Sequence, residues 1–395
     1  MKRCSEIVPK DAAVWHNLGK CCMDLRHNDN AERAWKEAVK LDPQWSGSWD
    51  GLGLVALRRG DFLKTIEYCD KALALAPNMM DSMVNRGMAY LAFRRWPEGW
   101  EGYCRNLGLN KDRKERVYGE EPRWDGAKDL NLVCYGEQGI GDEITFASVI
   151  PDLIEDSDSI VIECDKRLEG LFRRSFPGCE VHGTRYKEER PWLNGTRFDA
   201  RVAMGDLPKF YRGSTEAFPK VPYLKASPEM RLQWRALLDS MGTKPKIGIA
   251  WTGGINETGK ERRSLKLEQL LPILKCDADF ISLQYLDPNE ELEQLQETHG
   301  IKVHHWSWAH AYDYDQTVAL VAELDLIITV TTTVALTAGA LGKECWVLVP
   351  ERPIWMYCTE GEFPWFDLKL FRQNGEWPIN EMAAKLKEKY DRPAG

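Results

Sequence analysis

The sequence lacks several features that would define a class of protein. The sequence has no run of about 18 apolar residues, the length needed to cross a bilayer, and its N-terminus has no apolar core typical of a secretion signal. Eleven cysteines are present, but they show neither CxxC spacing nor the density of a disulfide framework. There is no basic excess either, because the formal net charge is -8 and the pI is near 5.6. These absences predict a cytoplasmic protein with reduced thiols and argue against a general nucleic-acid binder.

Metal-binding motifs are also missing. No HxxxH, HExxH or paired-carboxylate spacing stands out, so we expect no metal and no other cofactor. The chain has 395 residues, 43% of them hydrophobic and 10% aromatic, which favours two or three folded domains with real cores. Composition does not indicate an oligomeric state.

The first hundred residues repeat with a period of 34, the period of tetratricopeptide helix pairs. Equivalent positions are Trp15, Trp49 and Met83, then Gly19, Gly53 and Gly87, then Pro9, Pro43 and Pro77. We expect each glycine to allow close helix contact and each proline to stop a second helix. The pattern predicts two full repeats, an atypical third that fades near Asn110, and the end of an earlier helix at residues 1–8. Such a stack can bind a peptide, or it can be a spacer or a dimerisation surface.

From Leu130 onward, short runs rich in Val, Ile and Leu alternate with helical patterns, which predicts α/β structure with parallel sheets. The expected strands are LNLVCYG, SIVIECD, a segment near 199–204, KIGIAW, DFISLQY, LIITV and ECWVLV. A break near 222–228 indicates two doubly wound units with a cleft between them. Because ligands bind beyond the carboxyl ends of such strands, four loops are candidates, those after Tyr135, Trp251, Gln284 and Val330.

The segment 326–350, LIITVTTTVALTAGALGKECWVLVP, reads as a buried strand, a threonine turn, a small-residue helix and a second strand. Thr331, Thr332 and Thr333 offer hydroxyls and backbone N–H groups at a helix start, which attracts phosphate. The small residues that follow allow the helix to approach a ligand closely. A phosphate site and an ordinary βαβ unit explain the segment equally well.

The loop GEQGIGDE, residues 136–143, follows the first expected strand and leads into a helix. Its glycines, Gly139 and Gly141 among them, let the backbone approach a ligand. Asp142 can accept a proton from an acceptor hydroxyl, as an inverting glycosyl transfer requires. Asp142 and Glu143 are also typical helix-capping residues, and from these residues alone the cap is the favoured interpretation.

The segment TGGINETGKERRS after KIGIAW carries Lys260, Arg262 and Arg263, and an amphipathic helix, LKLEQLLPIL, is predicted after it. Fixed cations can stabilise a departing diphosphate where no metal is bound, and a solvated loop is the alternative. We expect Arg263 to be the cation that faces inward. Gln284 and Tyr285 at the end of the next strand can bind and stack on a nucleobase, or can form a turn.

Together these segments resemble the tetratricopeptide-repeat glycosyltransferases, whose second half is similar to the heptosyltransferase-type GT-B enzymes. The resemblance covers nearly the whole chain. It rests on GEQGIGDEITFASVIPDL, IGIAW, ERRSLKLEQLLPIL, ISLQY, ELDLIITVTTTVALTAGALGKECWVLVP and LKLFRQNGEWP. It implies two Rossmann-like domains, a nucleotide-sugar donor held mostly by the C-terminal one, and inverting transfer without an obligatory metal.

The resemblance also assigns roles to particular residues. Asp142 matches the expected base, and Arg263 and Ser264 match a pair beside the donor diphosphate. Thr332, Thr333 and Val334 match the turn whose backbone N–H groups receive phosphate. The other candidates come from the loops themselves: Lys260 and Thr331 at the diphosphate, Thr252, Gln284 and Tyr285 at the nucleotide, and Gly139, Gly141 and Glu143 on the acceptor side. Trp355, Trp365 and Arg372 match a C-terminal segment that is either a structural clamp or an acceptor contact.

Two positions depart from the family pattern. The related enzymes usually have an Asp at the position of Thr331 and a His at the position of Leu336. These departures put the choice of donor in doubt, but they leave Asp142, Arg263 and the threonine turn in place.

The predicted fold class is therefore helical tetratricopeptide repeats followed by a GT-B fold of two Rossmann-like α/β domains. The expected boundaries are 1–110 for the repeats, 111–129 for a linker, 130–228 for the acceptor-side domain, 229–378 for the nucleotide-sugar domain and 379–395 for a C-terminal helix. The predicted function is inverting transfer of a sugar from a nucleotide sugar to a hydroxyl of a protein or peptide bound by the repeats, of a glycan, or of a hydroxylated DNA base. The alternative is a catalytically silent scaffold whose α/β half is structural or senses a nucleotide sugar.

Overall fold

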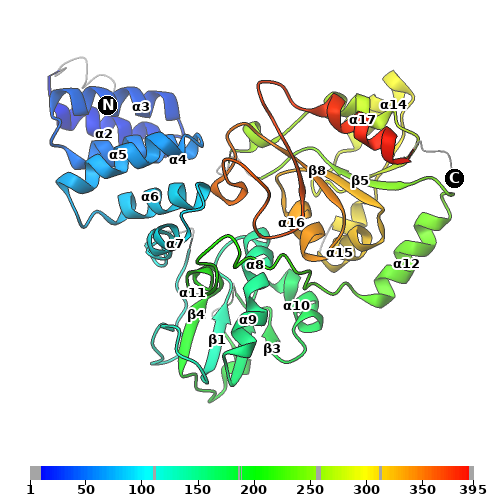
Figure 1. Ribbon diagram of the computed structural model, residues 1–395, viewed down its shortest axis with the longest axis horizontal. Helices are drawn as coiled ribbons and strands as arrows, with labels where there is room; N and C mark the ends of the chain where they lie inside the picture. Colours follow the sequence, from blue (N-terminus) through cyan, green and yellow to red (C-terminus); the bar gives the residue numbers. More distant parts are fainter. Residues whose placement is uncertain are drawn as a thin grey trace. The chain divides into compact units, whose positions relative to one another are not determined.

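The computed structural model describes residues 10–109, 113–185, 187, 189–254, 259–310 and 314–390 (Figure 1). The chain divides into two compact units. The first unit contains residues up to Lys114 together with two short later segments, Arg212–Ala217 and Arg352–Gly361. The second unit contains the remaining segments, Glu115–Tyr211, Phe218–Glu351 and Glu362–Gly395.

The described part of the first unit consists of three helix pairs. The helices are α2 (Ala12–Asp24), α3 (Asn28–Leu41), α4 (Ser46–Arg58), α5 (Phe62–Leu75), α6 (Met80–Ala92) and α7 (Trp96–Cys104). Pro43 and Pro77 lie just beyond the ends of α3 and α5, as predicted for residues that stop a helix. The features predicted at residues 1–9 and near Asn110 lie outside the described residues.

Glycines at equivalent repeat positions allow the helices to touch. A methyl group at Gly19 would overlap the indole ring of Trp35, and one at Gly87 would lie 2.7 Å from the Cα atom of Gly102. In both cases the added methyl group would be closer to these atoms than van der Waals contact between carbon atoms allows. The predicted close approach of helices at these glycines is therefore confirmed.

The third helix pair is covered by the two later segments of the same unit. Trp100 Nε1 donates a hydrogen bond to Arg212 O at 2.8 Å, and Trp96 Nε1 donates one to Thr215 Oγ1 at 3.0 Å. Trp355 packs edge-on against Trp100, with ring centroids 5.9 Å apart. Because a repeat stack must cover its terminal apolar face, these segments act as the cap of the third repeat.

Partly buried polar pairs join neighbouring repeats at equivalent positions. His16 Nδ1 lies 3.0 Å from Ser48 Oγ, and one repeat later Ser82 Oγ donates to Asp50 Oδ1 at 2.7 Å. Both serines are completely buried. Burial raises the pKa of Asp50 to about 6, and the nearby Asp81 acts in the same direction.

The second unit contains two parallel sheets, one in each half. The N-terminal half has the order β3-β2-β1-β4, with β1 (Asn131–Tyr135), β2 (Ser159–Glu163), β3 (Glu180–His182) and β4 (Ala200–Ala203). The C-terminal half has the order β10-β9-β8-β5-β6-β7, with β5 (Lys246–Ala250), β6 (Asp279–Ser282), β7 (Val303–His304), β8 (Leu326–Val330), β9 (Cys345–Val349) and β10 (Lys369–Arg372). The predicted fold class, helical repeats followed by two Rossmann-like α/β parts, is confirmed.

Helices pack beside both sheets (Figure 1). Those of the N-terminal half are α8 (Ile140–Phe146), α9 (Ile150–Glu155), α10 (Glu169–Ser175) and α11 (Pro208–Tyr211). Those of the C-terminal half are α12 (Pro228–Asp239), α13 (Leu271–Leu274), α14 (Asn289–His299), α15 (Tyr314–Glu323), α16 (Thr333–Ala340) and α17 (Ile379–Tyr390). Leu386 of α17 shares a buried cluster with Ile249 of β5 and Ile328 of β8, and each such side chain contributes about 1.5–3 kcal/mol by burial. Across the described segments, no helix is both long and apolar enough to span a membrane.

One predicted element differs from the structure. The segment 265–274 was expected to form a single amphipathic helix, but it forms a 3-10 turn at Leu267–Leu270 followed by the short helix α13. Pro272 lies in the first turn of α13. Because proline has no N–H to donate to a preceding turn, the helix restarts at this residue.

Gly87→Ala tests the helix contact in the third repeat. We expect it to lower the free energy of unfolding of the first unit by about 2 kcal/mol, because the added methyl group meets backbone that has little room to move. Urea unfolding followed by circular dichroism measures the change. Gly213→Ala is the matched control, since a methyl group at Gly213 has no atom within 4 Å. Equal stability of the two variants would contradict the close contact.

Asp50→Asn tests the buried carboxyl between repeats. Because the folded pKa of Asp50 lies above its unfolded value, folding favours the protonated form, and the fold loses stability as pH rises from about 4 to about 6. Asparagine keeps the acceptor for Ser82 without the charge. We therefore expect the variant to be more stable than the wild type by about 1–3 kcal/mol above pH 7 and equally stable near pH 4, as measured by urea unfolding across this range. A difference that did not depend on pH would argue against this assignment.

Candidate functional site

The strand order of the C-terminal half reverses between β5 and β8, which pair directly with each other. In open α/β sheets, ligands bind beyond the carboxyl ends of the strands at this reversal. The loop after β5 carries Thr252, Arg263 and Ser264, and the turn after β8 carries residues 331–334. The predicted donor-binding residues therefore lie at the place where the topology favours a ligand.

The loop after β5 and the turn after β8 touch. A methyl group at Gly253 would lie 3.0 Å from Thr332 Cγ2 and 3.1 Å from Thr331 O. Ser264 Oγ accepts a hydrogen bond from Gly253 N at 3.1 Å, and Arg263 Nη1 donates one to Thr331 O at 3.3 Å. Gly253 was not predicted as a site residue, although its position directly after a buried strand was a signal of close backbone approach.

Arg263 is the buried cation of its loop. Arg263 is 7% exposed, whereas Lys260 and Arg262 are half-buried. The expectation that Arg263 faces inward agrees with this burial. A buried guanidinium carries several N–H donors, which suit the oxygens of a phosphate or carboxylate. Its contact with a donor diphosphate stays a prediction.

The hydroxyl group of Thr331 is buried, and it has no hydrogen-bond partner among the residues that the structure describes; Thr331 is 1% exposed. The hydroxyl of Thr329, on β8 just before Thr331, is equally buried, but it bonds to Val330 O and Thr332 Oγ1, each at 3.0 Å. An unsatisfied buried polar group costs about 1–3 kcal/mol. A ligand oxygen at Thr331 would remove this cost, beside the start of α16 where backbone N–H groups favour an anion.

The first turns of α8 and α16 meet, although they belong to different halves of the second unit. A methyl group at Gly141 would lie 2.9 Å from Thr333 Oγ1 and 3.3 Å from Leu336 Cδ1. Gly141 directly precedes Asp142. The structure therefore brings the loop with the expected base next to the threonine turn.

Asp142 caps α8, because its Oδ2 accepts a hydrogen bond from Gly139 N at 3.2 Å. The helix-cap interpretation of this residue is confirmed, and its role as a base stays a prediction. The two roles are compatible, since a carboxylate has about four acceptor positions and can accept more than one hydrogen bond at a time.

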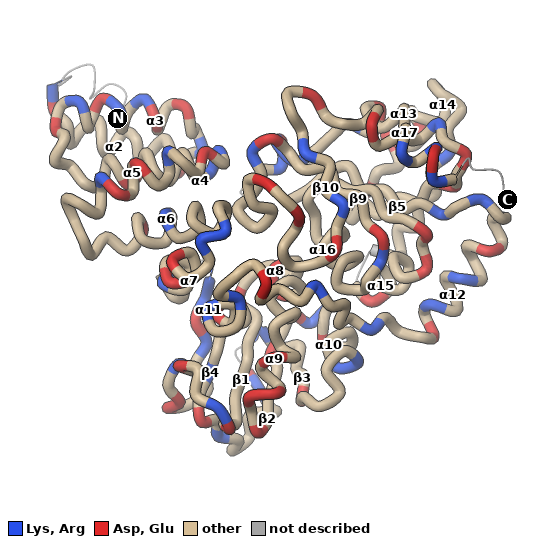
Figure 2. The backbone as a smooth tube through the Cα atoms, in the orientation of Figure 1, with Lys and Arg blue, Asp and Glu red and all other residues tan. Residues whose placement is uncertain are grey.

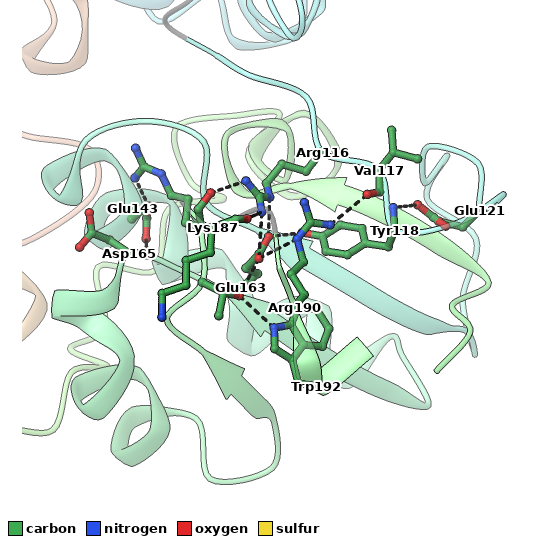
Figure 3. Close-up of polar contacts among 12 residues, drawn as sticks. Arg116, Val117, Tyr118, Glu121, Glu143, Glu163, Asp165, Lys187, Arg190 and Trp192 are labelled. Atoms are coloured by element: carbon green, nitrogen blue, oxygen red, sulfur yellow. Dashed lines mark hydrogen bonds and ion pairs between the residues drawn. The ribbon is translucent and has the colours of Figure 1, made fainter. Parts of the chain in front are cut away.

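Glu143 is buried beneath the same loop (Figure 3). It forms an ion pair with Arg185 and accepts a hydrogen bond from Asp165 N at 2.9 Å. Burial raises the pKa of Glu143 to about 7, against the opposite effect of the Arg185 guanidinium. The carboxyl group of Glu143 thus contacts the protein interior, while Gly139 of the predicted acceptor-side loop is exposed.

Gln284 and Thr252, two predicted nucleotide contacts, lie together at the ends of β6 and β5. Gln284 Nε2 donates a hydrogen bond to Thr252 Oγ1 at 2.5 Å, and Gln284 is buried. Tyr285 is 56% exposed. Its ring is therefore accessible to stack on a planar group.

A second buried carboxylate, Glu163 at the end of β2, was not predicted (Figure 3). Its oxygens lie 2.6 Å from Arg116 Nε and 3.3 Å from Arg190 Nε, and the hydroxyl of Tyr118 donates to it at 2.6 Å. This network joins the segment that opens the second unit to the sheet. Its members are far apart in the sequence, so no local motif could reveal them.

Comparisons with known proteins fit this architecture. Residues 12–45 match the tetratricopeptide repeat family model. Protein FlbA of Caulobacter vibrioides is 28% identical over 348 residues, which cover 75% of this chain and 58% of that protein. This chain thus spans little more than half the length of that curated relative.

Solved structures match the α/β part. The crystal structure of a glycosyl transferase family 9 protein from Veillonella parvula superposes with a TM-score of 0.50 at 10% identity, covering 69% of this chain and 99% of that chain. The structure of E. coli ADP-heptose LPS heptosyltransferase II has a TM-score of 0.47 at 14% identity, covering 66% of this chain and 99% of that chain. The first of these likenesses shows a shared fold.

Thr331→Val tests whether the site keeps an unsatisfied hydroxyl for a ligand. We expect the variant to be more stable than the wild type without ligand, by about 1 kcal/mol, because it removes a buried polar group that has no partner. Thr329→Val is the matched control and should be destabilising, since it removes a hydroxyl that is already bonded. Thermal unfolding of the two unliganded variants measures this. Loss of stability in Thr331→Val would show that the hydroxyl is satisfied within the protein.

Proposed function

We propose that this protein is an inverting glycosyltransferase that moves a sugar from a nucleotide sugar to a hydroxyl acceptor. One observation carries the proposal: the α8 loop with Asp142 contacts the threonine turn after β8. At this turn the buried Arg263 donates a hydrogen bond to Thr331 O, and the buried Thr331 hydroxyl has no partner among the described residues. The shared fold with a glycosyl transferase structure supports it.

In the proposed reaction the donor diphosphate lies at the start of α16. Arg263, Lys260, Ser264 and the backbone N–H groups of residues 332–334 bind its oxygens. The diphosphate becomes more negative as its bond to the sugar breaks, so fixed donors at this place lower the barrier without a metal or other cofactor. The nucleotide end extends toward Thr252, Gln284 and Tyr285 along the carboxyl ends of β5 and β6.

Asp142 removes the proton from the acceptor hydroxyl. The acceptor oxygen forms a bond to the sugar C1 atom while the bond from C1 to the diphosphate breaks, and the diphosphate leaves with the electron pair. A single displacement inverts the configuration at C1. The hydrogen bond from Gly139 N holds the Asp142 carboxylate at the start of α8. Because the carboxylate is already oriented, less of its conformational freedom is lost when the proton is transferred.

We further propose a cytoplasmic location and a protein or peptide acceptor bound by the repeats, since repeat stacks of this kind commonly present binding surfaces. Lys and Arg alternate with Asp and Glu along both units (Figure 2), which gives little support to a DNA acceptor.

Two variants separate binding from catalysis. We expect Arg263→Ala to weaken binding of UDP, ADP or GDP at least tenfold in calorimetry without added metal, because it removes a buried charge-assisted donor. Arg262→Ala removes a neighbouring charge of the same sign and should change affinity less than threefold.

Asp142→Asn should lower turnover of the bound nucleotide sugar at least a hundredfold while leaving its affinity within a few-fold. Release of nucleoside diphosphate, with water or a peptide library as acceptor, measures turnover. Binding without turnover in the wild type would favour a silent nucleotide-sugar sensor, and no binding at all would favour a structural scaffold.

A further inference from the structure

Asp142 and Glu143 are adjacent carboxylates with different surroundings. Asp142 is half-buried at the start of α8, whereas Glu143 is 1% exposed. Since α8 is a short helix, the first turn that contains both residues sets where Asp142 lies. An anchor on Glu143 therefore acts on Asp142 through a single peptide link.

The anchor on Glu143 is provided by the loops that follow β2 and β3. One carboxylate oxygen accepts from Asp165 N at 2.9 Å, and the other pairs with Arg185, which is itself 8% exposed (Figure 3). The backbone of Arg185 is also held, because its N–H donates to Cys164 O at 3.2 Å and its carbonyl accepts from Arg116. The guanidinium that meets Glu143 thus extends from a fixed backbone.

The other end of the loop depends on the same carboxyl group. A methyl group at Gly136 would overlap the Glu143 carboxyl, so the backbone at the start of the loop packs directly on it. Both ends of the segment 136–143 therefore rest on one side chain.

General stability is a weak explanation for this arrangement. A buried ion pair loses much of its attraction to the cost of desolvation, and apolar residues of similar size often stabilise a fold as well or better. Directional bonds to a carboxylate fix an orientation, which apolar packing does less well. This difference points to a role in geometry.

We propose that Glu143 and Arg185 form a positioning pair that holds the α8 loop so that Asp142 is placed to receive the acceptor proton. The proposal rests on the proposed function of Asp142. In this proposal both residues act through the loop and not by contact with the substrate.

The test compares Glu143→Gln, Arg185→Met and Arg185→Lys with the control Glu121→Gln. Glu121 is also a buried carboxylate in the same half, but it accepts a hydrogen bond from Tyr118 N at 2.8 Å and lies 3.8 Å from Arg201 Nη1. Each variant is measured in three ways: turnover of a nucleotide sugar, affinity for the nucleoside diphosphate, and amide hydrogen exchange of residues 137–146.

We expect Glu143→Gln and Arg185→Met to lower kcat at least tenfold, to leave diphosphate affinity within twofold, and to speed exchange in the α8 loop. Arg185→Lys should recover part of both kcat and protection, because it keeps the charge. The control should lower the melting temperature with kcat and loop exchange unchanged.

The proposal is overturned if Glu143→Gln matches the control in kcat and in loop exchange, or if affinity falls together with kcat. If Arg185→Met does not fold, Glu143→Gln and Arg185→Lys decide the question. Absence of turnover in the wild type would contradict the proposed glycosyltransferase function and not the positioning role of the pair. The exchange measurement would then still show whether the pair holds the loop.

Discussion

Contact between backbone and neighbouring groups at glycine positions underlies both units of this protein. In the first unit, Gly87 lets α6 approach α7 so closely that no side chain fits between them. In the second unit, Gly253 and Gly141 bring two loops against the threonine turn after β8. The candidate site forms because three backbone segments converge at glycines, which have no side chain to keep them apart. This close approach fixes the directions in which the polar groups of the site point.

Desolvated charge is the second constraint on the site. Arg263, Glu143, Arg185 and Glu163 are all buried, and burial of a charge is costly unless partners are placed to meet it. In the N-terminal half the partners are protein groups, so Glu143 and Glu163 are held in place by arginines. In the described part of the C-terminal half the Thr331 hydroxyl has no protein partner, which leaves the start of α16 as the part of the site most suited to an external anion. The two halves therefore differ in how these groups are met: Glu143 and Glu163 have protein partners in one half, and the Thr331 hydroxyl in the other half is open to a ligand.

Much of the fold was predictable because its signals are local or periodic. The 34-residue period placed the repeats, and uniformly apolar runs placed β1, β5 and β8. The inward orientation of Arg263 was also predicted, on the expectation that at least one of three clustered cations is exposed and that Arg263 is the one that faces inward. The single helix predicted at 265–274 was wrong because Pro272 interrupts it. The Glu143–Arg185 and Glu163–Arg116 pairs were missed because they join residues more than 40 positions apart, and such pairing is a property of the sheet order, which no short motif records.

The cap of the third repeat has a consequence for the order in which the protein can fold. The helices of the first unit are synthesised within the first 104 residues, but the segments that cover Trp96, Trp100 and Tyr103 include residues 352–361. A chain emerging from the ribosome therefore exposes this aromatic surface until nearly the whole second unit has been made. The helices of the repeat unit precede the second unit in the sequence, yet the cover of their last pair is complete only after residues 352–361 have been made.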